Sequence, residues 1–321
     1  MLKTALTERL GLTVPVVSAP MAGISGGALA AAVSEAGGLG MIGVGSATPV
    51  EWLRGEAGVA AASGRPYGIG LMAWALPERQ DLLEAAIEAR PALVSVSFGD
   101  CRSHVGALRD AGILTATQVG HVDDAREAEA AGVDLIVARG AEAGGHGRDH
   151  VGTLLLLQEV LEEVRTPVLA AGGIATGRGL AAVLAAGAEG AWVGTAFLTT
   201  REARSKAGAR RRLLEAGDGD TVYTRVFDIG AGIPWPAEFG GRALRNRFSD
   251  RWHGREEALA GDEDARRELT EALRAGDEGM ATIYAGQGAA LLREEPTAAE
   301  VVARLGREAE EAVARLGARS G

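Results

Sequence analysis

The chain has 321 residues, 47% of them hydrophobic and 24% charged, so it can bury a large core and need not be disordered. Its net charge of −10 disfavours binding to nucleic acid or to an anionic membrane surface. A single cysteine, Cys101, excludes an intrachain disulfide and any multi-cysteine metal site. Because there is no apolar leader and no unbroken apolar run of about 20 residues, we expect a soluble cytoplasmic protein.

Short apolar runs alternate with Ala-rich amphipathic stretches through the first 200 residues. Most of these runs lack polar alternation, which is typical of parallel strands buried on both faces. The predicted strands are Val16–Ala19, Gly40–Val44, Tyr67–Met72, Leu93–Ser97, Leu114–Gln118, Leu135–Ala138, Val168–Ala171 and Gly190–Val193. This alternation predicts an α/β fold, and eight strands favour a (β/α)8 TIM barrel; a doubly wound open sheet is the alternative.

The alternation of strand and helix stops near residue 200. Residues 201–279 contain charge runs without a clear period, and they predict a mainly helical insertion, or lid, over the barrel mouth. Residues 297–316 are amphipathic again and predict a closing helix whose capping box begins at Thr297. We therefore expect a barrel of residues 1–200 and 280–321, interrupted between its eighth strand and its last helix.

The first candidate motif is Ala19-Pro20-Met21-Ala22-Gly23, directly after the first predicted strand. Pro20 fixes its own φ and lacks an N–H donor, so the strand ends there. The small residues around it would let a flat ring lie against the backbone. A simple turn from strand to loop is the alternative.

The second motif is the glycine-rich run from Arg139 to Gly147, after the sixth predicted strand. A Gly-Gly pair exposes backbone amides to an anionic or polar ligand. His146 follows a strand's carboxyl end, where barrel enzymes hold their catalytic groups, and imidazole can exchange protons near neutral pH. The alternative is a histidine that only bonds to a loop carbonyl.

The third motif consists of the turns after the seventh and eighth predicted strands, Ala171-Gly172-Gly173 and Trp192-Val193-Gly194-Thr195. Barrels commonly build a phosphate site in these two loops from glycine amides and a short helix N-terminus. Thr195 adds a hydroxyl donor. The motif predicts a bound phosphate without identifying the molecule, and glycine turns that bind no ligand are the alternative.

At these motifs the sequence resembles the nitronate monooxygenase family, formerly called 2-nitropropane dioxygenases, over nearly the whole chain. The resemblance is carried by the segments 19–23 with 31–40, 142–146, and 171–174 with 194–195. Enoyl-acyl carrier protein reductase II looks like the same group and shares these motifs.

The resemblance implies an FMN-dependent oxidoreductase without a metal, in which His146 is catalytic. The FMN contacts that it implies are Ala19, Pro20, Met21, Gly70, Arg139, Gly144, Gly173, Trp192, Val193, Gly194 and Thr195. Two positions depart from the usual pattern, because family members commonly have Asn where Gly70 stands and often Gln where Arg139 stands. Losing the Asn amide removes a hydrogen bond to the flavin. Arg139 would favour an anionic reduced flavin, or would point at the phosphate or at Glu142.

The implied reaction is the oxidation of alkyl nitronates with dioxygen to a carbonyl compound and nitrite, by a monomer or homodimer. His146 would stabilise the nitronate charge, or remove the α-proton of a neutral nitroalkane. The alternative is an NAD(P)H-dependent FMN reductase acting on an enoyl thioester or a quinone. A flavin-free sugar-phosphate barrel would need a lysine or paired carboxylates at strand ends, and the two lysines, Lys3 and Lys206, end no predicted strand.

Overall fold

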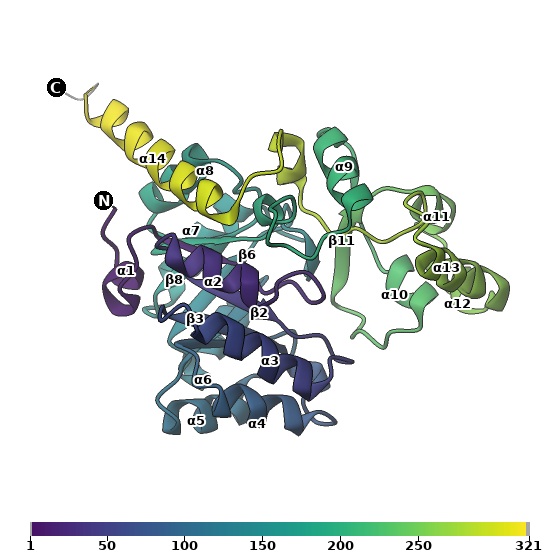
Figure 1. Cartoon of the computed structure of the whole chain (residues 1–321), viewed down its shortest axis with the longest axis horizontal. Coiled ribbons are helices and arrows are strands. Elements are labelled where there is room, and N and C mark those ends of the chain that lie inside the picture. The colour runs from purple at the N-terminus through teal and green to yellow at the C-terminus, as the bar shows by residue number, and fades with distance from the viewer. Residues whose placement is uncertain (1, 319–321) are drawn as a thin grey trace.

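Eight parallel strands form a barrel in the computed structural model, which describes residues 2–318 (Figure 1). The barrel strands are β1 (Val16–Ser18), β2 (Gly40–Gly43), β3 (Tyr67–Met72), β4 (Leu93–Ser97), β5 (Leu114–Val119), β6 (Leu135–Arg139), β8 (Val168–Ala171) and β9 (Gly190–Val193). They pair in the order β1-β9-β8-β6-β5-β4-β3-β2, and a parallel bridge from Val17 to Leu39 brings β1 back to β2. The predicted TIM barrel is confirmed, in place of the open sheet.

Helices surround the strands. The helices of the barrel are α1 (Ala5–Leu10), α2 (Gly27–Glu35), α3 (Val50–Ala61), α4 (Gln80–Glu88), α5 (Arg102–Asp110), α6 (Val122–Ala131), α7 (Thr153–Glu163), α8 (Gly177–Ala185) and α14 (Ala298–Gly317). The predicted closing helix is α14, which packs against α8 and α2. Its capping box is confirmed, since Thr297 accepts from the Glu300 amide while the Glu300 side chain accepts from the Thr297 amide. None of the helices within residues 2–318 combines the length and the apolar character needed to cross a membrane.

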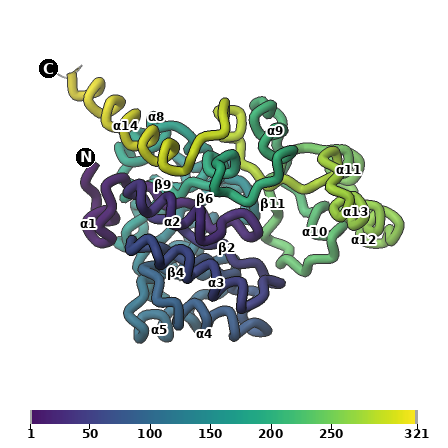
Figure 2. Tube along the Cα trace, viewed as in Figure 1, coloured from purple at the N-terminus to yellow at the C-terminus, as the bar shows by residue number. Residues whose placement is uncertain are grey.

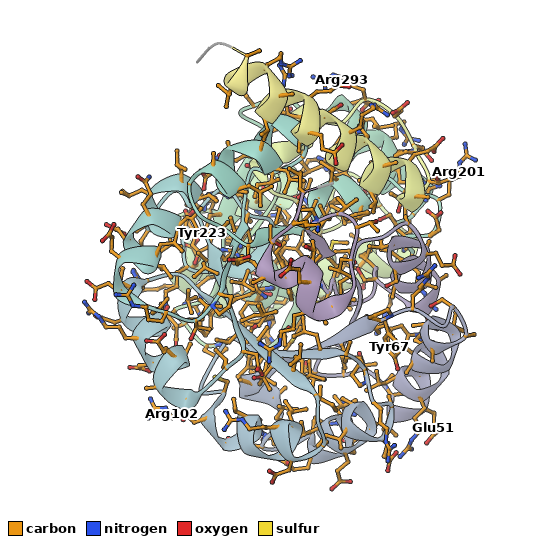
Figure 3. All side chains as sticks on the ribbon, turned by 90° about the vertical axis from the view of Figure 1, so that its left-hand side faces the viewer. Glu51, Tyr67, Arg102, Arg201, Tyr223 and Arg293 are labelled. Atoms are coloured by element: carbon orange, nitrogen blue, oxygen red, sulfur yellow. The ribbon has the colours of Figure 1, made fainter. Side chains whose placement is uncertain are left out.

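The strands are buried on both faces, so two apolar layers form. Val16 faces the outer layer between strands and helices, while its neighbour Val17 faces the barrel interior. Helix α1 lies across the base of the barrel (Figure 3), and its Leu6 belongs to the interior cluster. Trp192 belongs to that cluster too, near the opposite end, where it lines a cavity. Apolar side chains therefore fill the barrel interior toward the amino ends of the strands, and the cavity lies at their carboxyl ends.

Between β9 and α14 the chain leaves the barrel and forms the insertion. Its elements are α9 (Ala207–Glu215), β10 (Thr221–Thr224), α10 (Val226–Ala231), β11 (Gly240–Leu244), α11 (Arg247–Trp252), α12 (Glu256–Ala260) and α13 (Glu263–Ala275). A separate apolar cluster that includes Phe227, Phe248 and Leu269 holds α10 to α13 and β11 together, whereas Leu213 of α9 belongs to the outer layer of the barrel. In Figure 2 the two ends of the described chain lie at one end of the molecule and helices α10 to α13 at the other.

The insertion is mostly helical, as expected, but it also contains strands that the sequence did not reveal. Strands β10 and β11 form an antiparallel sheet with β7 (Gly145–Gly147), a strand within the glycine-rich run of residues 139–147, which we call the histidine loop. β7 reads Gly-His-Gly, which has neither apolar alternation nor β-branched residues. The sheet therefore attaches the insertion directly to the segment that holds His146.

Candidate active site

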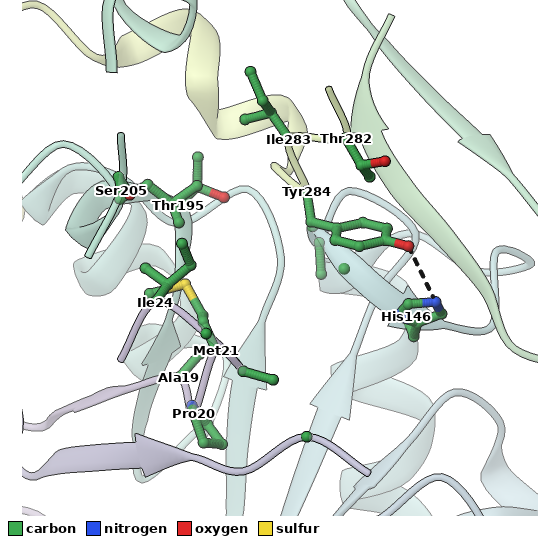
Figure 4. Close-up of a pocket in the computed structure, with 18 of the residues that line it drawn as sticks. Ala19, Pro20, Met21, Ile24, His146, Thr195, Ser205, Thr282, Ile283 and Tyr284 are labelled. Carbon is green, nitrogen blue, oxygen red and sulfur yellow. Dashed lines mark hydrogen bonds between the residues drawn. The ribbon is translucent and has the colours of Figure 1, made fainter. Parts of the chain in front are cut away.

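A cavity of about 770 Å³ lies at the carboxyl ends of the barrel strands, between the barrel and the insertion. Its volume falls within the range of small-molecule sites, about 300–1,000 Å³. His146 lines this cavity together with most of the residues that the resemblance implies as FMN contacts. Those lining residues are Ala19, Pro20, Met21, Arg139, Gly144, Gly173, Trp192, Gly194 and Thr195. Figure 4 shows the loop of Pro20 and Met21 on one side of the cavity and His146 with Tyr284 on the other.

Gly70 and Val193 are placed behind the cavity wall. A Cβ atom at Gly70 would overlap the ring of Pro20, so the missing side chain leaves room for a proline that itself forms the wall. An Asn at this position would meet the same ring. The Val193 side chain is buried in the outer apolar layer, between strands and helices. Both residues shape the cavity through their neighbours.

The first motif is fixed by a serine that sequence reasoning did not single out. Ser25 is fully buried, and its hydroxyl donates to the Ala19 carbonyl at 3.1 Å while accepting from the Met21 amide at 3.3 Å. These two bonds cross the turn and hold Pro20 toward the cavity. A flat ligand would therefore meet a loop that is already ordered.

The glycine turns after β8 and β9 lie side by side, because Ala171 pairs with Trp192 in the register of the two strands. Gly172 and Gly173 have φ values of +121° and +67°, a region that favours glycine. No other described residue accepts a hydrogen bond from the Gly173 amide.

Thr195 stands in the second of these two turns, directly after β9. Its hydroxyl oxygen accepts from the Gly286 amide at 2.9 Å, which leaves the hydroxyl hydrogen able to donate toward the cavity. The two turns thus present a free amide and a hydroxyl in one place, and these are groups that suit a phosphate. The residues present fit the phosphate group of the implied cofactor.

Arg139 lies beneath the histidine loop. Its guanidinium donates to the carbonyls of Ala143, Gly144 and Gly145 at 2.8–3.2 Å, and to the Arg148 carbonyl at 3.2 Å. Burial lowers the pKa of Arg139 to about 10, so the group stays charged at neutral pH. Of the directions left open by the sequence, the one toward Glu142 is not taken, because that carboxylate accepts instead from Thr153.

His146 is held by three side chains from the segment between β9 and α14. Its Nε2 lies 3.0 Å from both carboxylate oxygens of Asp228 on α10. The ring of Trp235 stacks on the imidazole with centroids 3.6 Å apart and planes 6° apart. Tyr284 donates its hydroxyl to Asp228 Oδ1 at 3.0 Å and lies 3.5 Å from His146 Nε2. We call these four residues the histidine cluster.

Tyr284 keeps its proton in this cluster. Burial raises the pKa of the Tyr284 phenol well above 10, and the neighbouring Asp228 carboxylate raises it further. The Asp228 and His146 side chains are only 5% and 10% exposed, so water competes little for their contacts. The phenol is therefore a permanent donor to the carboxylate.

Sequence reasoning missed three members of the histidine cluster. Asp228 stands among apolar residues in Val226–Ala231, and an acidic residue in such a run is a signal of a buried partner. Trp235 stands between two prolines in a stretch without a clear period, and Tyr284 has no local signal. Their proximity to His146 depends on the pairing of β7 with β11, which local patterns do not encode.

These features together define an enzyme built on a TIM barrel. They are the cavity at the carboxyl ends of the strands, the glycine turns after β8 and β9, which suit a phosphate, and the histidine cluster. The family model described as nitronate monooxygenase matches residues 3–308. The chain therefore belongs to the nitronate monooxygenase family, a family of oxidoreductases, and the resemblance found in the sequence is confirmed.

Known proteins of two kinds are similar to the chain. A protein named nitronate monooxygenase from Paraburkholderia phytofirmans is 34% identical, with 98% of this chain and 97% of the relative covered. The structure of FabK from Thermotoga maritima matches with a TM-score of 0.88 at 31% identity, covering 99% of this chain and 100% of the other. Nitroalkane oxidase from Streptomyces ansochromogenes matches with a TM-score of 0.83 at 34% identity, covering 98% and 100%.

Proposed function

We propose that this protein oxidises alkyl nitronates with dioxygen, yielding a carbonyl compound and nitrite, with FMN as its cofactor. The observation that carries the proposal is a single cavity that unites His146 with the glycine turns after β8 and β9. The family match and the names of the similar proteins support the reaction class.

FMN would supply an electron acceptor that can also react with dioxygen. The Gly173 and Thr195 backbone, with the Thr195 hydroxyl, would hold its phosphate, because free amides and hydroxyls at this place suit an anion. Pro20 and Met21 would lie against the ring, on the ordered loop that Ser25 fixes. Arg139 would act through the histidine loop, whose carbonyls it binds.

His146 would meet the substrate. Its Nε2 is engaged by Asp228, while its side chain lines the cavity, so the ring can approach the nitro group of a bound molecule. As a cation it would stabilise the negative charge of a nitronate, and as a neutral base it would take the α-proton of a nitroalkane. Acid–base help of this kind is typically worth about 10²–10⁴-fold in rate.

The test is His146→Ala, assayed by oxygen uptake and nitrite release with propionate-3-nitronate. We expect bound flavin, seen in the visible spectrum, to remain while turnover falls by about 10²–10⁴-fold. His253→Ala is the control, because the side chain of that histidine is 46% exposed on the insertion, where it lies 3.8 Å from Glu256 and does not line the cavity. Full activity of the His146 variant would remove this residue from the reaction.

The second candidate is an NAD(P)H-dependent FMN reductase acting on an enoyl thioester or a quinone, favoured by the close fit to FabK from Thermotoga maritima. Anaerobic mixing with NADH or NADPH separates the two functions. Rapid bleaching of the flavin indicates the reductase, and an unchanged spectrum indicates the oxidation of nitronates.

We propose further that residues 1–200 and 280–321 form the FMN-binding barrel, with 201–279 as its lid. The protein would act in the cytoplasm on a small molecule and dioxygen. It would do so as a monomer or homodimer, which size-exclusion chromatography with light scattering distinguishes.

A further inference from the structure

We infer that Asp228 is a positioning residue that fixes the tautomer of His146, so that Nδ1 carries a lone pair toward the cavity and accepts the α-proton of a neutral nitroalkane. This inference rests on the proposed function, in which His146 as a neutral base takes the α-proton of a nitroalkane, and it adds the residue that prepares the ring for that step.

The tautomer follows from the donors and acceptors around Asp228. An ionised carboxylate only accepts hydrogen bonds, and both of its oxygens lie 3.0 Å from His146 Nε2. The Tyr284 hydroxyl also donates to this carboxylate, because burial keeps the phenol protonated. Nε2 must therefore carry a hydrogen, and in a neutral imidazole Nδ1 is then the acceptor.

Nδ1 is the ring nitrogen available to a ligand. Within residues 2–318, no hydrogen bond to His146 Nδ1 is formed, although the same side chain lines the cavity. The ring cannot easily rotate to exchange its two nitrogens, because Trp235 stacks on its face at 3.6 Å. Asp228 and Trp235 together fix both the tautomer and the orientation.

Asp228 is itself held rigidly. It lies on α10, whose Phe227 stacks on Phe248 in the core of the insertion with ring centroids 6.1 Å apart. Gly230, on the same helix, has no room for a Cβ, which would lie 2.6 Å from Leu269 and 2.9 Å from Phe248. Because α10 packs this closely, the carboxylate stays in place without help from the ligand.

The transfer of the proton from the nitroalkane to His146 requires no oxidant or reductant. The Nδ1 lone pair takes the hydrogen of the nitroalkane α-carbon, so the C–H bond breaks and an N–H bond forms. The electron pair of the broken bond enters the new C=N bond, and the negative charge moves onto the nitro oxygens. The imidazole becomes a cation, whose charge the Asp228 carboxylate stabilises across 3.0 Å. The nitronate formed is the substrate of the proposed oxidation.

The tautomer can be observed directly in the flavin-loaded protein. With ¹⁵N-labelled histidine, the ring-nitrogen shifts at alkaline pH report which nitrogen carries the hydrogen, and His146→Ala identifies the signals among the five histidines. We expect the Nε2–H form in the wild type, and a smaller proportion of it in Asp228→Asn and Asp228→Ala. An Nδ1–H form in the wild type, or an unchanged proportion in both variants, would overturn the inference.

Kinetics with a matched pair of substrates give the second test. Nitroethane requires proton removal and ethyl nitronate does not, so Asp228→Asn should lower kcat/KM for nitroethane by about 10²–10⁴-fold. We expect the loss with ethyl nitronate to be under about tenfold, and the bound flavin spectrum to be unchanged. Equal losses with both substrates would show a structural role only and would overturn the inference.

Different outcomes would contradict the proton-accepting role of His146 and the proposed function itself. If the wild-type protein consumes ethyl nitronate but not nitroethane, the proposed function stands and the proton-accepting role of His146 is wrong. If it consumes neither, the proposed function itself is wrong, and the use of nitroalkanes inferred from it is wrong as well.

Discussion

At the scale of single residues, the two glycines after β8 set what the cavity can bind. Gly173 adopts φ +67°, and a Cβ there would meet nothing closer than Glu142 at 3.6 Å. A side chain would have room here, so the left-handed backbone is the reason that this position is glycine. That conformation turns an amide with no partner among the described residues toward the proposed phosphate.

Gly173→Ala should weaken FMN binding, because an L side chain pulls the turn out of the left-handed region and turns the amide away. Losing one hydrogen bond to a charged group costs about 1.5–3 kcal/mol. The dissociation constant should rise by roughly 10- to 100-fold. Flavin fluorescence titration of the apoprotein measures it.

Gly11→Ala is the matched control for this variant. Gly11 has φ +66°, ends helix α1 and has open space around it, so the backbone strain is the same but the cavity is remote. It should lower the free energy of unfolding by roughly 1 kcal/mol and leave FMN affinity unchanged. Equal affinity in the two variants would contradict a phosphate contact by Gly173.

At the scale of elements, the pairing of β7 with β11 builds the histidine cluster. Gly241 stands opposite His146, and a Cβ there would lie 2.6 Å from the Tyr284 ring and 3.5 Å from His146 Nε2. The strand can pass between these side chains only because it has none at this position. The sheet thereby brings residues of the insertion onto a loop of the barrel.

Gly241→Ala should displace Tyr284 and remove a donor from Asp228. We expect turnover to fall by about 10- to 100-fold, since small displacements of positioned groups have effects of this size. Bound flavin should remain, as seen in the spectrum. Gly219→Ala, at a turn residue with nothing within 4 Å, should keep full activity; a normal rate in both variants would argue against a role for the cluster.

How much of these elements the sequence predicts depends on how local their signals are. The barrel strands are continuous apolar runs, and the closing helix begins with a capping box, so both are predictable. β7 is not, because Gly-His-Gly becomes a strand only through its partner β11. His146 is predictable from its glycine loop, whereas Asp228 lies 82 residues further on and meets it only in the fold.

At the scale of the whole molecule, barrel and insertion share one cavity. Pro20, Gly173 and Thr195 come from the barrel, while Asp228 and Trp235 come from the insertion. A ligand in this cavity contacts both parts, so its binding energy adds to the stability of the complete fold.

FMN should therefore raise the unfolding temperature of the apoprotein. At a ligand concentration of 100 times Kd, the stabilisation is about 2.7 kcal/mol. Urea or thermal unfolding with added FMN measures it, and riboflavin, which lacks the phosphate, should stabilise less at equal concentration. An equal effect of the two ligands would contradict the phosphate site between β8 and β9.

The backbone of β7 couples the orientation of the His146 ring to the packing of the insertion. Its pairing with β11 joins the strand of His146 to the part of the chain that supplies Asp228, so a substitution that loosens this sheet should also disturb the contact between the imidazole and the carboxylate. The orientation of the reactive ring therefore depends on residues 82 or more positions away in the chain, and the barrel alone does not determine it.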